Sequence, residues 1–183
     1  ARYVTRAIAF DGDLGEWRGL PALEFANNDN RIRLHAVWNT RFLCVAVRVD
    51  DEAVFPSPDR QPPGLDTVMP VRLQDGVELY FDLLNDKSPV RRGDDYRIAI
   101  GATGVYAVDA PFTPRDSTRA PLLASRLDSA GYTIEAGFLW DQLPFTPAAG
   151  SEIGFNCVNA DRETLEGMVA RADWAGFGDC CPD

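Results

Sequence analysis

Short segments in which apolar and polar residues alternate recur along the chain, and they restrict the fold more than any other feature. The clearest is Asp75–Asp82, where Val77, Leu79 and Phe81 share one face of an extended strand and polar residues occupy the other. Further segments that predict strands are Tyr3–Phe10, Arg31–Trp38, Phe42–Val49, Asp94–Ile100, Gly101–Asp109, Leu122–Leu127, Tyr132–Leu139, Ile153–Asn159 and Met168–Trp174. About ten strands with little helix predict an all-β fold, an antiparallel β-sandwich of the immunoglobulin or jelly-roll kind.

The length predicts a single domain covering residues 1–183, with a long proline-rich loop at 50–74. Loops this long without regular structure are often functional. The net charge of −10 argues against nucleic acid and suits a neutral ligand or a bound cation. No apolar run is long enough to span a membrane within this segment. The chain has no initiator methionine, so we expect a processed protein or a domain of a larger one.

Two of the four cysteines, Cys44 and Cys157, fall in predicted strands. They are either small core residues or the partners of a disulfide, and the sequence leaves both alternatives open. Cys180 and Cys181 lie close to the end of the chain, and the four cysteines show no zinc-binding spacing.

The polar face of Asp75–Asp82 is the first candidate for a functional site. Glu78 and Tyr80 lie on that face, and Arg97 lies on the polar side of Asp94–Ile100. We therefore expect the three side chains to belong to one ligand-facing sheet. The alternative is an exposed ion pair between Glu78 and Arg97 that contributes less than about 1 kcal/mol to stability.

Several motifs, in their order along the chain, resemble carbohydrate-binding module family 9. They are Ile8-Ala9-Phe10-Asp11-Gly12-Asp13-Leu14-Gly15-Glu16-Trp17, Val37-Trp38-Asn39, Leu43-Cys44-Val45-Ala46-Val47, Asp50-Asp51, Gly76-Val77-Glu78-Leu79-Tyr80-Phe81-Asp82, Asp95-Tyr96-Arg97-Ile98, Gly131-Tyr132-Thr133-Ile134-Glu135-Ala136, Leu139-Trp140, Gly154-Phe155 and Val158-Asn159. The resemblance covers nearly the whole chain. It extends to related sandwiches that serve as sensor domains and as b-type haem carriers.

The resemblance implies a site in which two tryptophans clamp a terminal sugar and polar side chains bind its hydroxyls. Glu78 and Arg97 match the polar positions, and Trp174 matches the later tryptophan. The earlier tryptophan should precede Glu78 by a few residues, but Met69–Leu73 contains none. Phe55 or Met69 are the candidates to replace it. Of the other tryptophans, we expect Trp17 and Trp140 to close the ends of the sandwich and Trp38 to lie in the core.

The function implied is that of a non-catalytic carbohydrate-binding module that recognises the end of a sugar or oligosaccharide on one sheet face. Such a module would be secreted or periplasmic and part of a larger protein. The first alternative is the extracytoplasmic sensor domain of a membrane signalling protein. The second is a b-type haem carrier, with candidate axial ligands His35, Met69, Met168 and Lys87. The chain contains no nucleophile elbow or phosphate-binding loop, and His35 is its only histidine.

Calcium is the cofactor that the acidic turns and the resemblance suggest. The candidate ligands are Asp11, Asp13, Asp50, Asp51 and Asp82. Calcium prefers carboxylate and carbonyl oxygens, although these residues do not form an EF-hand loop. The alternative is that they are solvated turn residues and helix caps.

Overall fold

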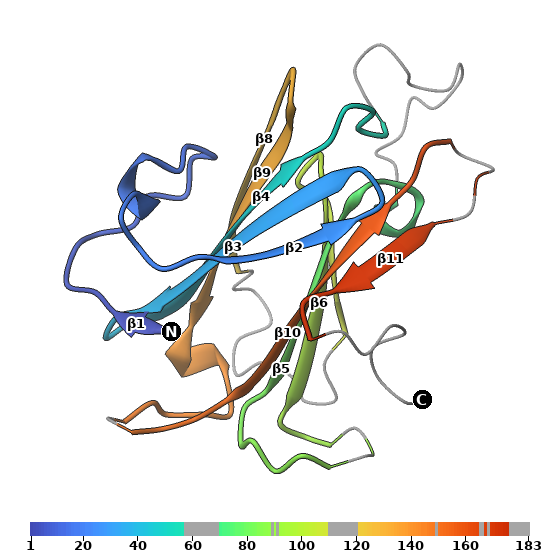
Figure 1. Cartoon of the computed structure of the whole chain (residues 1–183). Coiled ribbons are helices and arrows are strands. Elements are labelled where there is room, and N and C mark those ends of the chain that lie inside the picture. Colours follow the sequence, from blue (N-terminus) through green and yellow to red (C-terminus); the bar gives the residue numbers. More distant parts are fainter. Residues whose placement is uncertain are drawn as a thin grey trace.

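The computed structural model describes residues 1–56, 70–88, 90, 92–109, 121–148, 150–164, 167 and 169–175. Within these residues, eleven strands form two sheets that face each other (Figure 1). The first sheet contains β1 (Arg2–Tyr3), β2 (Leu23–Asn27), β3 (Asn30–Trp38), β4 (Phe42–Asp50), β8 (Leu122–Asp128) and β9 (Gly131–Leu139). The second contains β5 (Gly76–Asp82), β6 (Asp95–Gly101), β7 (Tyr106–Asp109), β10 (Gly154–Asp161) and β11 (Ala170–Asp173).

The strand order confirms the predicted sandwich. The first sheet runs β1-β3-β4-β9-β8, with β2 also paired to β3, and the second runs β11-β10-β5-β6-β7. All pairings are antiparallel except that of β1 with β3. The described helical pieces are three short 3₁₀ helices, at Gly15–Trp17, Val71–Leu73 and Trp140–Gln142. None of the helices in the described ranges is long and apolar enough to cross a membrane.

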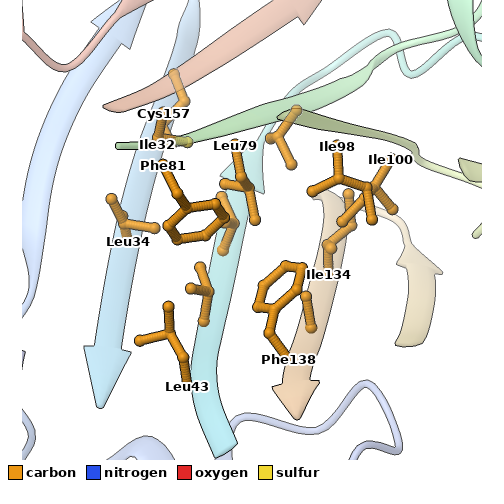
Figure 2. Packing of buried hydrophobic residues seen from close by; sticks show 14 of the residues in the cluster. Ile32, Leu34, Leu43, Leu79, Phe81, Ile98, Ile100, Ile134, Phe138 and Cys157 are labelled. Atoms are coloured by element: carbon orange, nitrogen blue, oxygen red, sulfur yellow. The ribbon is translucent and has the colours of Figure 1, made fainter. Parts of the chain in front are cut away.

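The main core lies between the sheets and contains the side chains that the alternation assigned to it. Leu79 and Phe81 of β5 meet residues of the first sheet such as Leu34 and Phe138 (Figure 2). The Phe81 and Phe138 rings contact edge to face, with centroids 5.1 Å apart. Because the odd-numbered residues of β5 point into this core, the even-numbered residues face outward from the second sheet.

The outer face of the first sheet carries a second apolar cluster. Val37, Cys44 and Ala46 are buried there together with Val4 and Trp17, which come from the N-terminal segment. The prediction that Trp17 closes an end of the sandwich is therefore wrong, although the residue is buried. It covers a sheet face.

The same apolar cluster explains the path of the N-terminal segment. The predicted strand Tyr3–Phe10 is wrong beyond Tyr3, because the segment leaves β3 and packs its apolar side chains, among them Phe10, onto that outer face. Glu135 of β9 fixes the segment there. Its carboxylate accepts hydrogen bonds from Trp17 Nε1 at 2.7 Å and from the Gly12 amide at 2.7 Å.

The structure decides between the two alternatives for the cysteines. Cys44 lies in the outer cluster and Cys157 in the core between the sheets, and both are free thiols. They are small buried residues and not a disulfide. Cys180 and Cys181 lie outside the described residues.

Candidate functional site

The outer face of the second sheet is hollowed because its central positions carry small side chains. Across the strands, Glu78 of β5 stands opposite Ala99 of β6, which stands opposite Ala107 of β7. In the neighbouring row, Ala160 of β10 stands opposite Gly76 of β5. A side chain on Gly76 would clash with the backbone, since its Cβ would lie 2.3 Å from the Ile100 carbonyl oxygen. Because these side chains are small, they leave a hollow in the surface of the sheet around Glu78, and they form its floor.

A pocket of about 510 Å³ occupies this hollow. Glu78, Arg97 and Arg171 line it together with the small floor residues. Part of its wall comes from Pro70, Val71 and Arg72, at and around the short helix that precedes β5. The volume falls in the range of pockets that hold small molecules.

Glu78 is the centre of a charged cluster in this pocket. Its Oε2 accepts hydrogen bonds from the Tyr80 hydroxyl and from Arg97, with Arg97 Nη2 at 2.9 Å. Its Oε1 pairs with Arg171 Nη2 at 2.7 Å. The Arg97 guanidinium also lies over the Tyr80 ring, 5.5 Å from the centroid. Both oxygens of one carboxylate are therefore held by three neighbouring side chains.

The surroundings keep Glu78 ionised although it is only 7% exposed. Burial by itself would raise the pKa of its carboxyl group. The Tyr80 hydrogen bond and the charges of Arg171 and Arg97 outweigh burial, and the pKa lies below its ordinary value. The ion pair is thus more than the exposed surface contact that was the alternative interpretation, since one partner is buried and hydrogen-bonded on both oxygens.

Three of the four predicted ligand-binding residues, Glu78, Tyr80 and Arg97, lie in direct contact. Trp174 follows β11, is 39% exposed and packs against Phe155, with ring centroids 6.4 Å apart. It is not among the residues that line the pocket. Arg171 was missed: the alternation of Ala170–Asp173 places it on a polar side of its own strand, but only the pairing of β11 with β10 puts that side next to Glu78.

The two candidates for a second stacking ring have different outcomes. Phe55 is buried and is not among the residues that line the pocket; its backbone amide donates to Asp75 Oδ2 at 2.6 Å. Met69 lies outside the described residues, as does Met168.

Of the other candidate haem ligands, His35 is buried on the outer face of the first sheet, where Nδ1 lies 2.9 Å from the Pro21 carbonyl oxygen. Lys87 lies in the turn after β5.

The five predicted metal ligands do not come together in one site. Asp11 and Asp13 accept amide hydrogen bonds within their own turn, at 2.8 Å each. Asp50 pairs with Arg48 at 2.8 Å. Asp82 lies beside two other carboxylates in the turn after β5, and its oxygens accept backbone amides there.

Asp51 belongs to a different group, which the sequence did not predict. One carboxylate oxygen from each of Asp51, Asp75 and Asp161 lies within 4.8 Å of the others, and all three residues are buried. Burial, followed by the neighbouring Asp51 carboxylate, raises the pKa of Asp75 to about 8, although amides of Phe55 and Arg162 donate to it. Asp51 Oδ2 is buried without a hydrogen-bond partner. Within the described residues, no arginine or lysine forms an ion pair with the three carboxylates.

Comparisons with known proteins agree with this fold. A family model described as "Carbohydrate family 9 binding domain-like" matches residues 21–179. A family 9 carbohydrate-binding module from Caldicellulosiruptor kristjanssonii, solved with cellotriose, is 20% identical with a TM-score of 0.72, over 94% of this chain and 83% of that one. The same kind of module solved with glucose gives 20% identity and a TM-score of 0.71, over 94% and 84% of the chains.

A more distant structure has the same architecture. A putative carbohydrate-binding protein from Bacteroides uniformis ATCC 8492 is 11% identical with a TM-score of 0.61, over 100% of this chain and 91% of that one. A comparison with curated protein sequences finds no match. At these identities the solved structures establish the fold, and the chemistry of the site must be argued from the residues of this chain.

Proposed function

This chain belongs to the carbohydrate family 9 binding domain-like family, and on that basis we propose that it is a non-catalytic module that binds the end of a sugar chain on the outer face of its second sheet. The observation that carries the proposal is the buried Glu78 held by Tyr80, Arg97 and Arg171 at the floor of a hollow. Sugar hydroxyls need directional donors and acceptors, and this cluster offers both.

The neighbouring structures support the class of ligand. One family 9 module of the same fold was solved with cellotriose and with glucose. A pocket of about 510 Å³ has room for one or two sugar rings. We expect affinity in the micromolar to millimolar range, about 4 to 8 kcal/mol of binding free energy, because a shallow site buries only part of its ligand.

Titration calorimetry with glucose and cellotriose tests the proposal. We expect the wild type to bind at least one of them, and Arg97→Gln to weaken binding about tenfold or more through loss of a charge-assisted donor. Trp174→Ala, tested beside it, decides whether the exposed ring at the end of β11 also contacts the ligand. Arg33→Gln, on the first sheet, is the control. If no sugar binds at millimolar concentration while the protein remains folded, the sensor-domain alternative takes its place.

We also propose that Asp51, Asp75 and Asp161 hold a calcium ion. Three buried carboxyl groups, which have no paired cation among the described residues, disfavour one another's ionisation, and the unpartnered Asp51 Oδ2 provides a free ligand oxygen. The donor set consists of oxygens, which suits Ca²⁺ and excludes a zinc site of the structural type. The ion would neutralise the charge and join the end of β4 to the start of β5 and the end of β10.

Thermal unfolding with and without calcium tests this second proposal. At about 5 mM Ca²⁺ we expect the melting temperature of the wild type to rise by several degrees relative to the EDTA-treated protein. Asp51→Asn should lose this response, and Asp11→Asn, in a different turn, should keep it. An equal melting temperature with calcium and with EDTA would overturn the assignment.

We propose that the module works outside the cytoplasm as part of a larger protein. Polysaccharide ends are accessible there, and extracellular calcium is abundant enough for sites of moderate affinity. The complete gene decides the point. A neighbouring hydrolase domain supports an appended binding module, and a membrane helix followed by a signalling region supports the sensor domain.

A further inference from the structure

The described residues that line the pocket carry more positive than negative formal charge, although the protein as a whole is strongly negative. The whole chain has a net charge of −10. The described residues that line the pocket include three arginines, Arg72, Arg97 and Arg171, and one carboxylate, Glu78. Their formal charges leave two positive charges in excess. This local reversal of sign needs an explanation, because like charges gathered in one hollow destabilise the unliganded protein.

Glu78 does not neutralise this excess. Its two oxygens pair with Arg97 and Arg171, one carboxylate against two guanidinium groups. Arg72 lies in the short helix at the pocket wall, is exposed, and has no ion-pair partner within the described residues. The arginines therefore form a donor surface in which Arg72 is available to a ligand that enters from solvent.

The donor geometry favours a planar anion. A guanidinium group presents several N–H donors in a fixed fork that matches the two oxygens of a carboxylate. A neutral sugar could accept hydrogen bonds from the same groups but would leave Arg72 without a charged partner among the described residues. The glycine and alanine residues at the floor of the pocket give the sugar ring access to Glu78. An acidic substituent on that ring would meet the arginines that line the pocket.

We infer that the preferred ligand is a sugar that carries a carboxylate, a uronic acid residue, with Arg72 and Arg171 as the groups that select it. This rests on the proposed carbohydrate binding at the same face and specifies its substrate class. The carboxylate of the sugar would pair with Arg72, which has no ion-pair partner among the described residues.

A matched pair of ligands tests the inference by calorimetry. Methyl β-D-glucuronide and methyl β-D-glucoside differ only at C6, as a carboxylate and a hydroxymethyl group. We expect the wild type to bind the glucuronide about tenfold more tightly at low salt. The preference should shrink between about 0.02 and about 0.5 M salt, because added ions screen the attraction.

Single variants then show which charge is responsible. Arg72→Gln should remove most of the preference for the glucuronide, since it removes the exposed charge that pairs with the carboxylate of the ligand and does not disturb Glu78. Arg33→Gln makes the same charge change on the first sheet, where the arginine pairs with Glu24, and should leave the preference intact.

The outcomes separate this inference from the proposed function. Equal affinity for the two methyl glycosides overturns the inference and leaves carbohydrate binding standing. A glucuronide preference that survives both Arg72→Gln and Arg171→Gln also overturns it. Acetate that binds as tightly as the glucuronide shows that the pocket selects a carboxylate without the sugar, which contradicts the assignment. If neither glycoside binds while thermal unfolding is normal, the inference fails, and the proposed function fails with it only if glucose and cellotriose do not bind either.

Discussion

At the scale of single residues, the ionisation state of Glu78 depends on its charged and hydrogen-bonding neighbours more than on its burial. A buried carboxylate normally becomes harder to ionise, and here the Tyr80 hydroxyl and two arginines reverse that tendency. The arrangement commits both carboxylate oxygens to protein donors before any ligand arrives. A ligand therefore meets a pre-oriented group of donors, which lowers the conformational entropy lost on binding.

Glu78→Gln should lower the free energy of unfolding by about 2 kcal/mol at neutral pH, because it leaves two guanidinium groups without their charged partner. The pKa of Glu78 is lower in the folded than in the unfolded protein. Its contribution is therefore complete above the unfolded pKa of about 4.3 and is lost as the pH falls through the folded value.

Urea unfolding of wild type and Glu78→Gln at pH about 7 and at pH about 3 measures this effect. The difference in stability should be large at the higher pH and shrink at the lower one. Glu24→Gln, which alters an exposed ion pair with Arg33, should change stability little at either pH. A difference that does not depend on pH would show that the ionised form of Glu78 contributes nothing.

At the scale of strands, the sequence predicted elements well where one face is buried. The alternation located β3, β4, β5, β6 and β9 because their inward residues form the common core. It missed β2, Leu23–Asn27, whose side chains are mostly exposed and so lack the pattern. It also extended the first strand to Phe10, because apolar residues that cover a sheet give the same signal as residues that belong to one. Periodicity reports burial and not hydrogen-bond pairing.

The sequence likewise predicted only the part of the candidate site around Glu78 that lies on strands with a clear alternation. Glu78, Tyr80 and Arg97 lie on strands with a clear alternation, so their shared face followed from the sequence. Arg171 lies on a four-residue edge strand far along the chain, and only the pairing of β11 with β10 brings it to Glu78. The buried group of Asp51, Asp75 and Asp161 joins three distant segments for the same reason. Long-range register of this kind cannot be read from local patterns.

Ala99→Leu tests whether the floor of small residues is the binding surface. Ala99 lies on β6 beside Glu78 and lines the pocket. A leucine there should fill the hollow and weaken sugar binding more than about tenfold, with stability changed by less than about 1 kcal/mol because the side chain faces outward. Ala26→Leu, at an exposed position of β2, is the matched control. Binding unchanged in Ala99→Leu, measured by calorimetry, would place the ligand elsewhere.

At the scale of the whole molecule, the two sheets have different outer surfaces. The N-terminal segment covers part of the outer face of the first sheet, where Trp17 is buried and bonded to Glu135. The outer face of the second sheet carries the hollow, the arginines and Glu78. The inner faces of both sheets are buried in the core. The outer face of the second sheet is therefore the surface on which a ligand can contact polar side chains that the protein already holds in place.

The most direct test of carbohydrate binding at this face is an NMR titration of the isotope-labelled protein with methyl glycosides and cellotriose. We predict that the backbone amides that shift will cluster on β5, β6, β10 and β11, around Glu78, Arg97 and Arg171. The amides of β3 and β4 should not shift. Shifts confined to the first sheet, or none at all with millimolar sugar, would contradict the account.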